Sequence, residues 1–232
     1  MSYFHGGPTV KIDFGAGDYA HRFGGKPQHQ IRGNNRKLTT LHCLYLLDCA
    51  DPGLPSIVAG QRWLPLYYPL FNNACEFAYE LLSDDEIKIH LVSEPPEEHF
   101  PYDAYPVVLP QRDVHLRTLS YEEEKTLVYY FNAEFANLGK AISVDDLKFV
   151  RDLGYPFTQL GGIQYMTQGK PEQRCPNPKC EYNDFSNMHT IFGVVWNNPV
   201  PGFQIWGEYG DYSQLIYQIC PKCHTIYVCN RC

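Results

Sequence analysis

The 232-residue chain lacks a long apolar run. No stretch approaches the roughly 18 consecutive apolar residues that a membrane-spanning helix needs. Its first residues, MSYFHGGPTVKIDFGAG, have no basic start followed by an apolar core, so no secretory signal is predicted. We therefore expect a cytoplasmic protein without a membrane partner, in which cysteine thiols stay reduced.

An excess of basic residues is also missing. Lys and Arg number 19 against 26 Asp and Glu, which gives a formal net charge of -7. Because nucleic-acid binding depends on clustered Lys and Arg, this balance argues against a nucleic-acid partner. It suits a basic protein partner, or simply solubility.

Familiar catalytic signatures are absent as well. The sequence contains no GxSxG, HExxH or Walker motif. Cys43, Cys49 and Cys75 are scattered in apolar settings and are interpreted as buried small side chains. No catalytic residues are therefore predicted, although a Cys–His pair whose members are distant in sequence stays open.

Aromatic and turn-forming residues are abundant. The chain is 44% hydrophobic, with 18 Tyr, 13 Phe, 18 Pro and 18 Gly. Short runs rich in Val, Ile, Leu and Tyr favour strands, and Pro and Gly supply the turns between them. The expected fold class is α+β and β-rich.

The order of motifs predicts an internal duplication. A Gly-Gly pair occurs in HRFGGKPQHQ and again in FTQLGGIQYMTQ. Each is followed by an apolar run with histidine in second place, LHCLYLLD from Leu41 and MHTIFGVV from Met188. A Pro-bearing turn and a second aromatic run, RWLPLYYPLF or YSQLIYQI, come next. We expect two similar β half-domains about a pseudo-twofold axis; chance similarity of two Gly-turn-strand units is the alternative.

Four segments follow from this organisation, together forming one compact unit. Residues 1–92 are expected to form the N-terminal β-rich repeat and 93–118 a Pro-rich connector. Residues 119–155 are expected to be a helical insert. Residues 156–232 would form the C-terminal β-rich repeat, with a zinc-ribbon-like knuckle.

Two helices are predicted in the insert. Ser120 and Glu123 form a capping-box pattern ahead of apolar residues at helical spacing. Ser143 caps a second, short helix in which Leu147 and Val150 are expected to face inward. The acidic clusters after both serines are explained as helix starts rather than catalytic groups.

Six of the nine cysteines lie in the last third of the chain. They form three close pairs, Cys175 and Cys180, Cys220 and Cys223, and Cys229 and Cys232. Zinc prefers four tetrahedral thiolate or imidazole ligands, which two short cysteine loops supply with little strain.

The predicted ligands are the first two pairs, Cys175, Cys180, Cys220 and Cys223. If the segment after Cys223 is a strand, Cys229 lies roughly 20 Å away and cannot bind the same ion. Ligand sets that include the terminal pair are the alternative. Four thiolates leave no open position for a reactive water, so a structural Zn²⁺ is expected.

These motifs resemble the YwqG-like family, a bacterial family of unassigned function. The resemblance rests on the two Gly-Gly segments, the cysteine loop and IWGEYGDYSQLIYQICPKC, in which WGEYG is similar to the WGD-x-G signature of the family. The programmed cell death protein 2 group, linked to chaperoning a ribosomal protein, is a more distant likeness.

The resemblance covers roughly residues 20–90 and 155–232. It implies a duplicated, β-rich fold and no established catalytic residues. The second copy has Gly162-Ile163-Gln164 where a proline would be expected, and the first copy has no cysteine knuckle. Only one zinc ion is therefore expected.

The expected function is a zinc-stabilised, cytoplasmic protein-binding domain without enzymatic activity. The sharpest hypothesis is an immunity protein, or antitoxin, that neutralises a cognate toxin domain. Tyr- and Trp-rich surfaces suit binding hot spots, and negative charge suits a basic toxin cleft. A chaperone or escort of a basic, ribosomal-type protein and an unrecognised enzyme are the alternatives.

Overall fold

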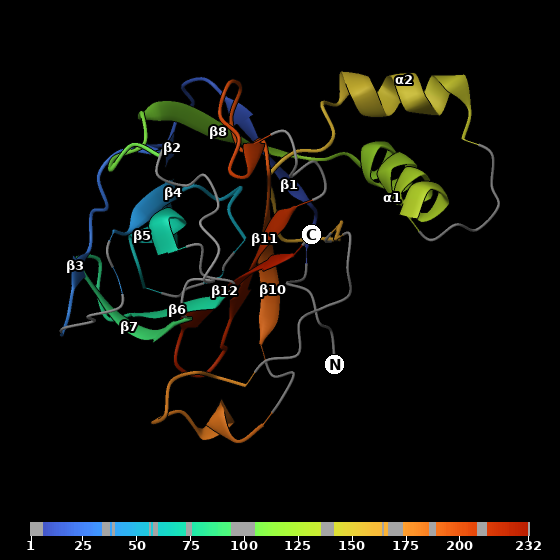
Figure 1. The fold of residues 1–232 in the computed structure, drawn as a ribbon. Coiled ribbons are helices and arrows are strands. Elements are labelled where there is room, and N and C mark those ends of the chain that lie inside the picture. Colours follow the sequence, from blue (N-terminus) through green and yellow to red (C-terminus); the bar gives the residue numbers. More distant parts are fainter. Residues whose placement is uncertain are drawn as a thin grey trace.

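A computed structural model confirms the β-rich α+β class. It describes residues 7–33, 38, 40–55, 57, 60–72, 76–93, 105–135, 142–163, 165–166, 174–185, 189–207 and 213–231. Within these ranges, twelve strands form one sheet and two α-helices stand beside it (Figure 1).

The sheet combines strands from the whole chain. Its strands are β1 (Val10–Phe14), β2 (Arg22–Phe23), β3 (Gln30–Ile31), β4 (His42–Asp48), β5 (Trp63–Tyr68), β6 (Glu76–Leu81), β7 (Glu86–Val92), β8 (Arg112–Thr118), β9 (Gln159–Leu160), β10 (Thr190–Trp196), β11 (Gln214–Ile219) and β12 (Thr225–Arg231). Their spatial order is β3-β7-β6-β12-β11-β10-β9-β1-β8-β2-β4-β5. Neighbours are antiparallel except β3 and β7, which are parallel.

The β5 end of the sheet packs against its middle. The Tyr79 hydroxyl of β6 donates to the Pro65 carbonyl of β5 at 2.6 Å, and the Tyr217 hydroxyl of β11 donates to the Tyr67 carbonyl at 3.3 Å. One large apolar cluster contains side chains from β4, β5, β6, β11 and β12. The sheet therefore curls around a core made by both ends of the chain.

The two Gly-Gly segments occupy corresponding positions. Gly24 donates its backbone N–H to the Leu44 carbonyl at 3.0 Å, and Gly161 donates to the Phe192 carbonyl at 2.9 Å. Each accepting residue lies at a register shift of its strand: Leu44 in the β4–β5 ladder and Phe192 in the β10–β11 ladder. These correspondences favour the predicted duplication.

The predicted alignment of the two copies is wrong by one residue. Because Leu44 corresponds to Phe192, His42 corresponds to Thr190 and His189 corresponds to Leu41. The two histidines that suggested the alignment therefore do not occupy equivalent places.

The predicted halves are interleaved in the sheet. β1 of the N-terminal half pairs with β9 of the C-terminal half on one side and with β8 on the other, and β8 pairs with β2. β6 also pairs with β12. In addition, β8 lies within residues 93–118, so the end of the predicted connector is a strand.

The helices are α1 (Tyr121–Phe135) and α2 (Val144–Asp152), with short 3-10 turns η1 (Leu70–Asn72) and η3 (Glu181–Asn183) elsewhere. The capping box is confirmed: Ser120 N–H donates to Glu123 Oε2 at 2.7 Å, and Glu123 N–H donates to Ser120 Oγ at 3.3 Å. Ser143 Oγ caps α2 by accepting from Asp146 N–H at 3.0 Å. No helix in the described ranges is long and apolar enough to cross a membrane.

The prediction that Leu147 faces inward is wrong. Leu147 is 41% exposed, whereas Val150 is buried as predicted. The buried side of α2 runs through Val150 towards Leu153, and both pack in a small cluster with Leu119 and Leu127. Leu147 lies about one turn before Val150 and does not belong to this cluster, which meets α2 only near its C-terminal end.

Candidate metal centre

The four predicted ligands lie together. The Sγ atoms of Cys175, Cys180, Cys220 and Cys223 are all within 4.8 Å of one another. Two of the separations, Cys175 to Cys223 and Cys180 to Cys220, are 3.5 and 3.7 Å. Sulfur atoms around a tetrahedral ion with bonds of about 2.3 Å lie about 3.8 Å apart. The cluster could therefore hold one metal ion through all four sulfurs.

The first cysteine loop is shaped by its own backbone. Cys180 N–H donates to the Asn177 carbonyl at 3.0 Å, and Cys175 N–H donates to the Tyr182 carbonyl at 3.2 Å. The Asn183 amide closes the loop by donating to the Cys175 carbonyl at 2.6 Å. Tyr182 N–H points at Cys180 Sγ, 3.5 Å away, where it would stabilise a thiolate.

The second loop is the turn between β11 and β12. Cys220 N–H donates to the Thr225 carbonyl at 2.9 Å, and His224 N–H donates to the Cys220 carbonyl at 3.0 Å. His224 has a φ of 55°, a left-handed conformation that tightens the turn. The hairpin therefore brings the Cys220 and Cys223 sulfurs to the same side of the turn.

The cluster favours negative charge at one position. Hydrogen bonds from the Cys175 and Cys220 thiols, and from the Thr225 hydroxyl, hold the pKa of Cys223 well below its usual range. Hydrogen bonds with Cys220 and Cys223, together with burial, raise the pKa of Cys175. A bound cation would displace the remaining protons, so metal affinity should depend on pH.

A contact outside the cluster links the two loops. Lys222 Nζ, from the second loop, lies 2.7 Å from a carboxylate oxygen of Glu181 in the first. The same ammonium lies 5.6 Å from the centre of the Tyr182 ring. Both contacts are exposed, so they add little stability compared with a shared ion.

The remaining cysteines lie elsewhere. Cys229 is buried on β12 in a cluster with Ala78 and Ile191, and it does not belong to the four-thiol group. Its neighbour Cys232 lies outside the described residues, as does Cys75. Cys43 is buried as predicted, and burial raises its pKa to about 12, whereas Cys49 is only half-buried, so the prediction is wrong for it.

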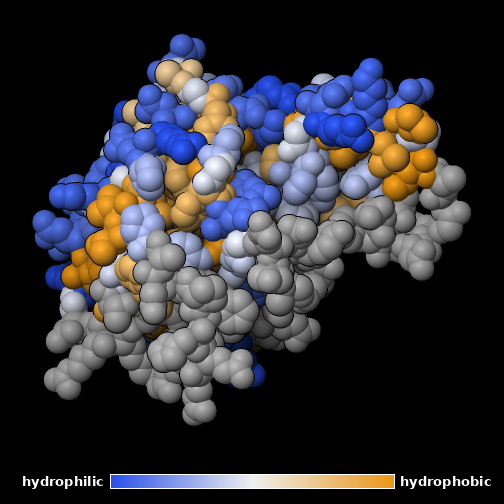
Figure 2. Space-filling view, turned by 45° about the horizontal axis from the view of Figure 1, so that its top comes forward, coloured by the Kyte–Doolittle hydropathy of each residue, from blue (hydrophilic) through white to orange (hydrophobic). Residues whose placement is uncertain are grey.

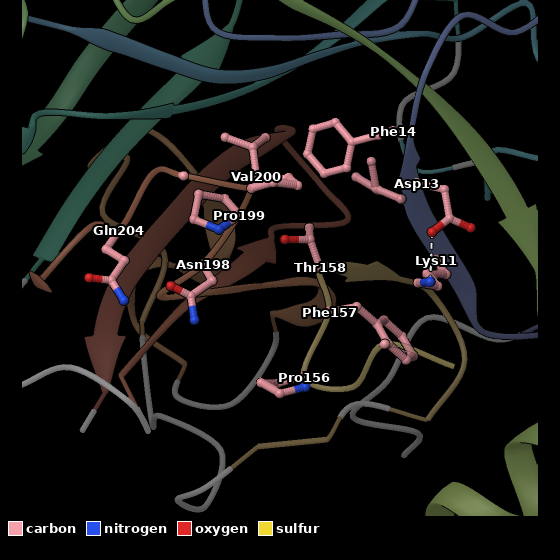
Figure 3. Close-up of a pocket in the computed structure, with 14 residues that line it drawn as sticks. Lys11, Asp13, Phe14, Pro156, Phe157, Thr158, Asn198, Pro199, Val200 and Gln204 are labelled. Carbon is pink, nitrogen blue, oxygen red and sulfur yellow. Dashed lines mark ion pairs between the residues drawn. The ribbon is translucent and has the colours of Figure 1, made fainter. Parts of the chain in front are cut away.

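A separate cavity of about 560 Å³ lies between β1, residues 154–158 and residues 198–204 (Figure 3). Lys11 Nζ on one wall lies 2.6 Å from Asp13 and donates to the Leu153 carbonyl at 2.8 Å. Arg117 Nε also contacts Asp13, at 3.3 Å. Because these charges are engaged with one another, the cavity suits binding of an uncharged group better than acid–base chemistry. Sequence reasoning missed it, since its walls come from three distant segments.

The comparisons with known proteins yield no matching family model, no matching curated protein and no matching solved structure. The resemblance to the YwqG-like family therefore stays a prediction. Among the described residues, the four-thiol cluster is the most specific chemical feature.

Proposed function

We propose that this chain is a zinc-stabilised protein-binding domain. The observation that supports it best is the four-thiol cluster. Soft thiolates in a tetrahedral arrangement suit zinc, and four of them complete its coordination. The ion would tie residues 174–185 to the β11–β12 hairpin, which makes a structural role more plausible than a catalytic one.

Exposed apolar side chains on the helical segment support protein binding. Tyr121 is 75% exposed, Val144 81% and Leu147 41%. Figure 2 shows a hydrophobic area on the side of the molecule where the helices lie. Exposed apolar surface of this kind often marks contact with another protein.

The metal part of the proposal is tested by native mass spectrometry and chelation. We expect one zinc ion per chain, which is lost in Cys220→Ser together with a large fall in the thermal transition. Structural zinc contributes roughly 10–16 kcal/mol in small peptides, comparable with the stability of a whole domain. Cys229→Ala is the matched control because it removes a buried thiol outside the cluster. A chain that binds no metal, or an unchanged transition after chelation, would contradict the proposal.

The sharpest form of the proposal is an immunity protein for a basic toxin, supported by the net charge of -7. Co-expression with the product of the adjacent gene tests it. Rescue of cells from that toxin is the expected result. Failure to rescue, with a basic ribosomal protein recovered from lysate instead, would favour an escort function.

A further inference from the structure

A groove of about 580 Å³ lies against the metal centre. It forms where β12 pairs with β6, since Thr225 beside the cysteine turn is the ladder partner of Glu80. Its volume lies within the range of small-ligand sites, about 300–1,000 Å³. The side chains that line it include Arg32, Glu80, Leu82, Lys88, Lys179 and Cys180.

Three cations meet in this groove on a chain that is acidic overall. Lys88 stands directly opposite Glu80 across the β6–β7 ladder. The Glu80 carboxylate instead lies 2.8 Å from Nε2 of His90. Among the residues that the structure describes, Arg32, Lys88 and Lys179 form no ion pair. Their charges are therefore available to a ligand.

The backbone under the cations is held in place before any ligand arrives. Arg32 follows β3, and its N–H donates to the Ile87 carbonyl at 2.7 Å. Lys179 N–H donates to Asn177 Oδ1 at 3.1 Å within the first cysteine loop. Lys88 lies within β7. Ligand binding would therefore reduce the conformational entropy of the side chains but little of that of the backbone, and this small loss favours affinity.

We infer that this groove binds an acidic peptide segment of a protein partner. Carboxylates of the segment would pair with Arg32, Lys88 and Lys179, and Leu82 offers an apolar contact. A nucleic acid fits less well because, among the residues that the structure describes, no aromatic side chain lines the groove, and such binding usually uses stacking. The inference rests on the proposed function in one respect, since the metal would fix the loop that carries Lys179.

A competing role for the cations is electrostatic support of the metal centre. Four thiolates around a divalent ion carry two excess negative charges, and Cys180 and Cys223 border the groove. Cations that serve only this purpose would raise metal affinity and bind no external anion. A Lys→Gln change in the groove should therefore weaken anion binding if the cations bind a ligand, and weaken metal binding alone if they only support the metal centre.

The test uses the zinc-loaded full chain and fluorescein-labelled hexaglutamate, with hexaglutamine as the uncharged comparison. Fluorescence anisotropy should show hexaglutamate binding that weakens with salt, and no hexaglutamine binding. Arg32→Gln and Lys88→Gln should each weaken binding about tenfold, the loss of roughly one charge pair. Lys148→Gln is the matched control because Lys148 is exposed on α2, away from the groove.

Zinc content and zinc affinity are measured for every variant. Zinc-loaded protein that ignores hexaglutamate overturns the inference and leaves the proposed metal site intact. Hexaglutamate binding by a chain that holds no zinc contradicts the proposed metal site and supports the groove. Three other outcomes would overturn the inference. The groove variants could bind zinc more weakly without any change in hexaglutamate affinity, or Lys148→Gln could lose as much hexaglutamate affinity as they do. The protein could also bind a single-stranded oligonucleotide more tightly than hexaglutamate.

Discussion

At the scale of single residues, tyrosine hydroxyls bond to the backbone of β5, which is the edge strand of the described sheet. Tyr79 donates to the Pro65 carbonyl at 2.6 Å and accepts from Tyr67 N–H at 3.2 Å. We expect Tyr79→Phe to lower the free energy of unfolding by about 1–3 kcal/mol, because two buried backbone groups lose their partner. Urea unfolding measures the change. Tyr121→Phe removes an exposed hydroxyl and should change stability by less than about 0.5 kcal/mol; equal losses would contradict the argument.

Two glycines with positive φ allow the cost of backbone strain to be compared with the cost of steric crowding. Gly162 has a φ of +56°, and a Cβ there would overlap the backbone and hydroxyl of Thr9. Gly202 has a φ of +76°, but a Cβ there would meet nothing within 4 Å. Gly202→Ala should therefore cost about 1–2 kcal/mol of left-handed strain alone.

Gly162→Ala should cost a further 1–3 kcal/mol or so for forcing Thr9 aside. Denaturant unfolding of the two variants under the same conditions provides the comparison. If the two alanine variants lost the same stability, the close packing of the Gly-Gly turn against Thr9 would not contribute.

At the scale of elements, the sequence predicted what is set locally and failed where distant contacts decide. The α1 cap follows from Ser120 and Glu123, which are three residues apart and satisfy each other. The exposure of Leu147 depends on how α2 packs against α1 and the small apolar cluster beside it, and no local pattern records that. The one-residue error between His42 and His189 has the same origin, since ladder irregularities shift register without a sequence signal.

A buried histidine connects β4 to two other segments. His42 Nε2 donates to the Pro106 carbonyl at 3.2 Å, and its Nδ1 accepts from Leu70 N–H at 3.3 Å. Protonation would place a second donor opposite Leu70 N–H. Burial lowers the pKa of His42 from 6.5 to about 4.

The unfolded chain therefore takes up this proton first as the pH falls. The stabilisation from neutral His42 is complete above about pH 6.5 and is lost progressively towards pH 4, by roughly 3 kcal/mol at most. His42→Gln should lack this component. The measurement is the difference in unfolding free energy between wild type and variant across this range, in which the pH dependence of the metal site cancels. A difference that stays constant with pH would refute the assignment.

At the scale of the whole molecule, the metal centre could be predicted and the groove beside it could not. The four cysteines carry their own spacing signal, and the strand after Cys223 removes Cys229 from the set. Arg32, Lys88 and Lys179 have no common spacing. They meet because β3 pairs with β7 and β6 pairs with β12, which are contacts between distant parts of the chain.

The same pairing changes what metal loss should do. Because all four ligands lie in residues 156–232, the ligand positions alone would confine the effect of zinc removal to the C-terminal part. In the structure, the turn that carries Cys220 and Cys223 joins β11 to β12, and β12 forms the ladder that holds β6. Loosening this turn should therefore release strands of the N-terminal segment as well.

Hydrogen exchange with and without chelator tests this coupling. We expect amides of β6 and β7 to lose protection together with those of β11 and β12, in one cooperative transition, because a structural zinc contributes roughly as much free energy as a whole domain holds. The loss of protection should extend to β5, because the hydroxyls of Tyr79 on β6 and Tyr217 on β11 donate hydrogen bonds to the β5 backbone. If β6 stayed protected while β12 exchanged, the two halves would be separate cooperative units despite their shared sheet.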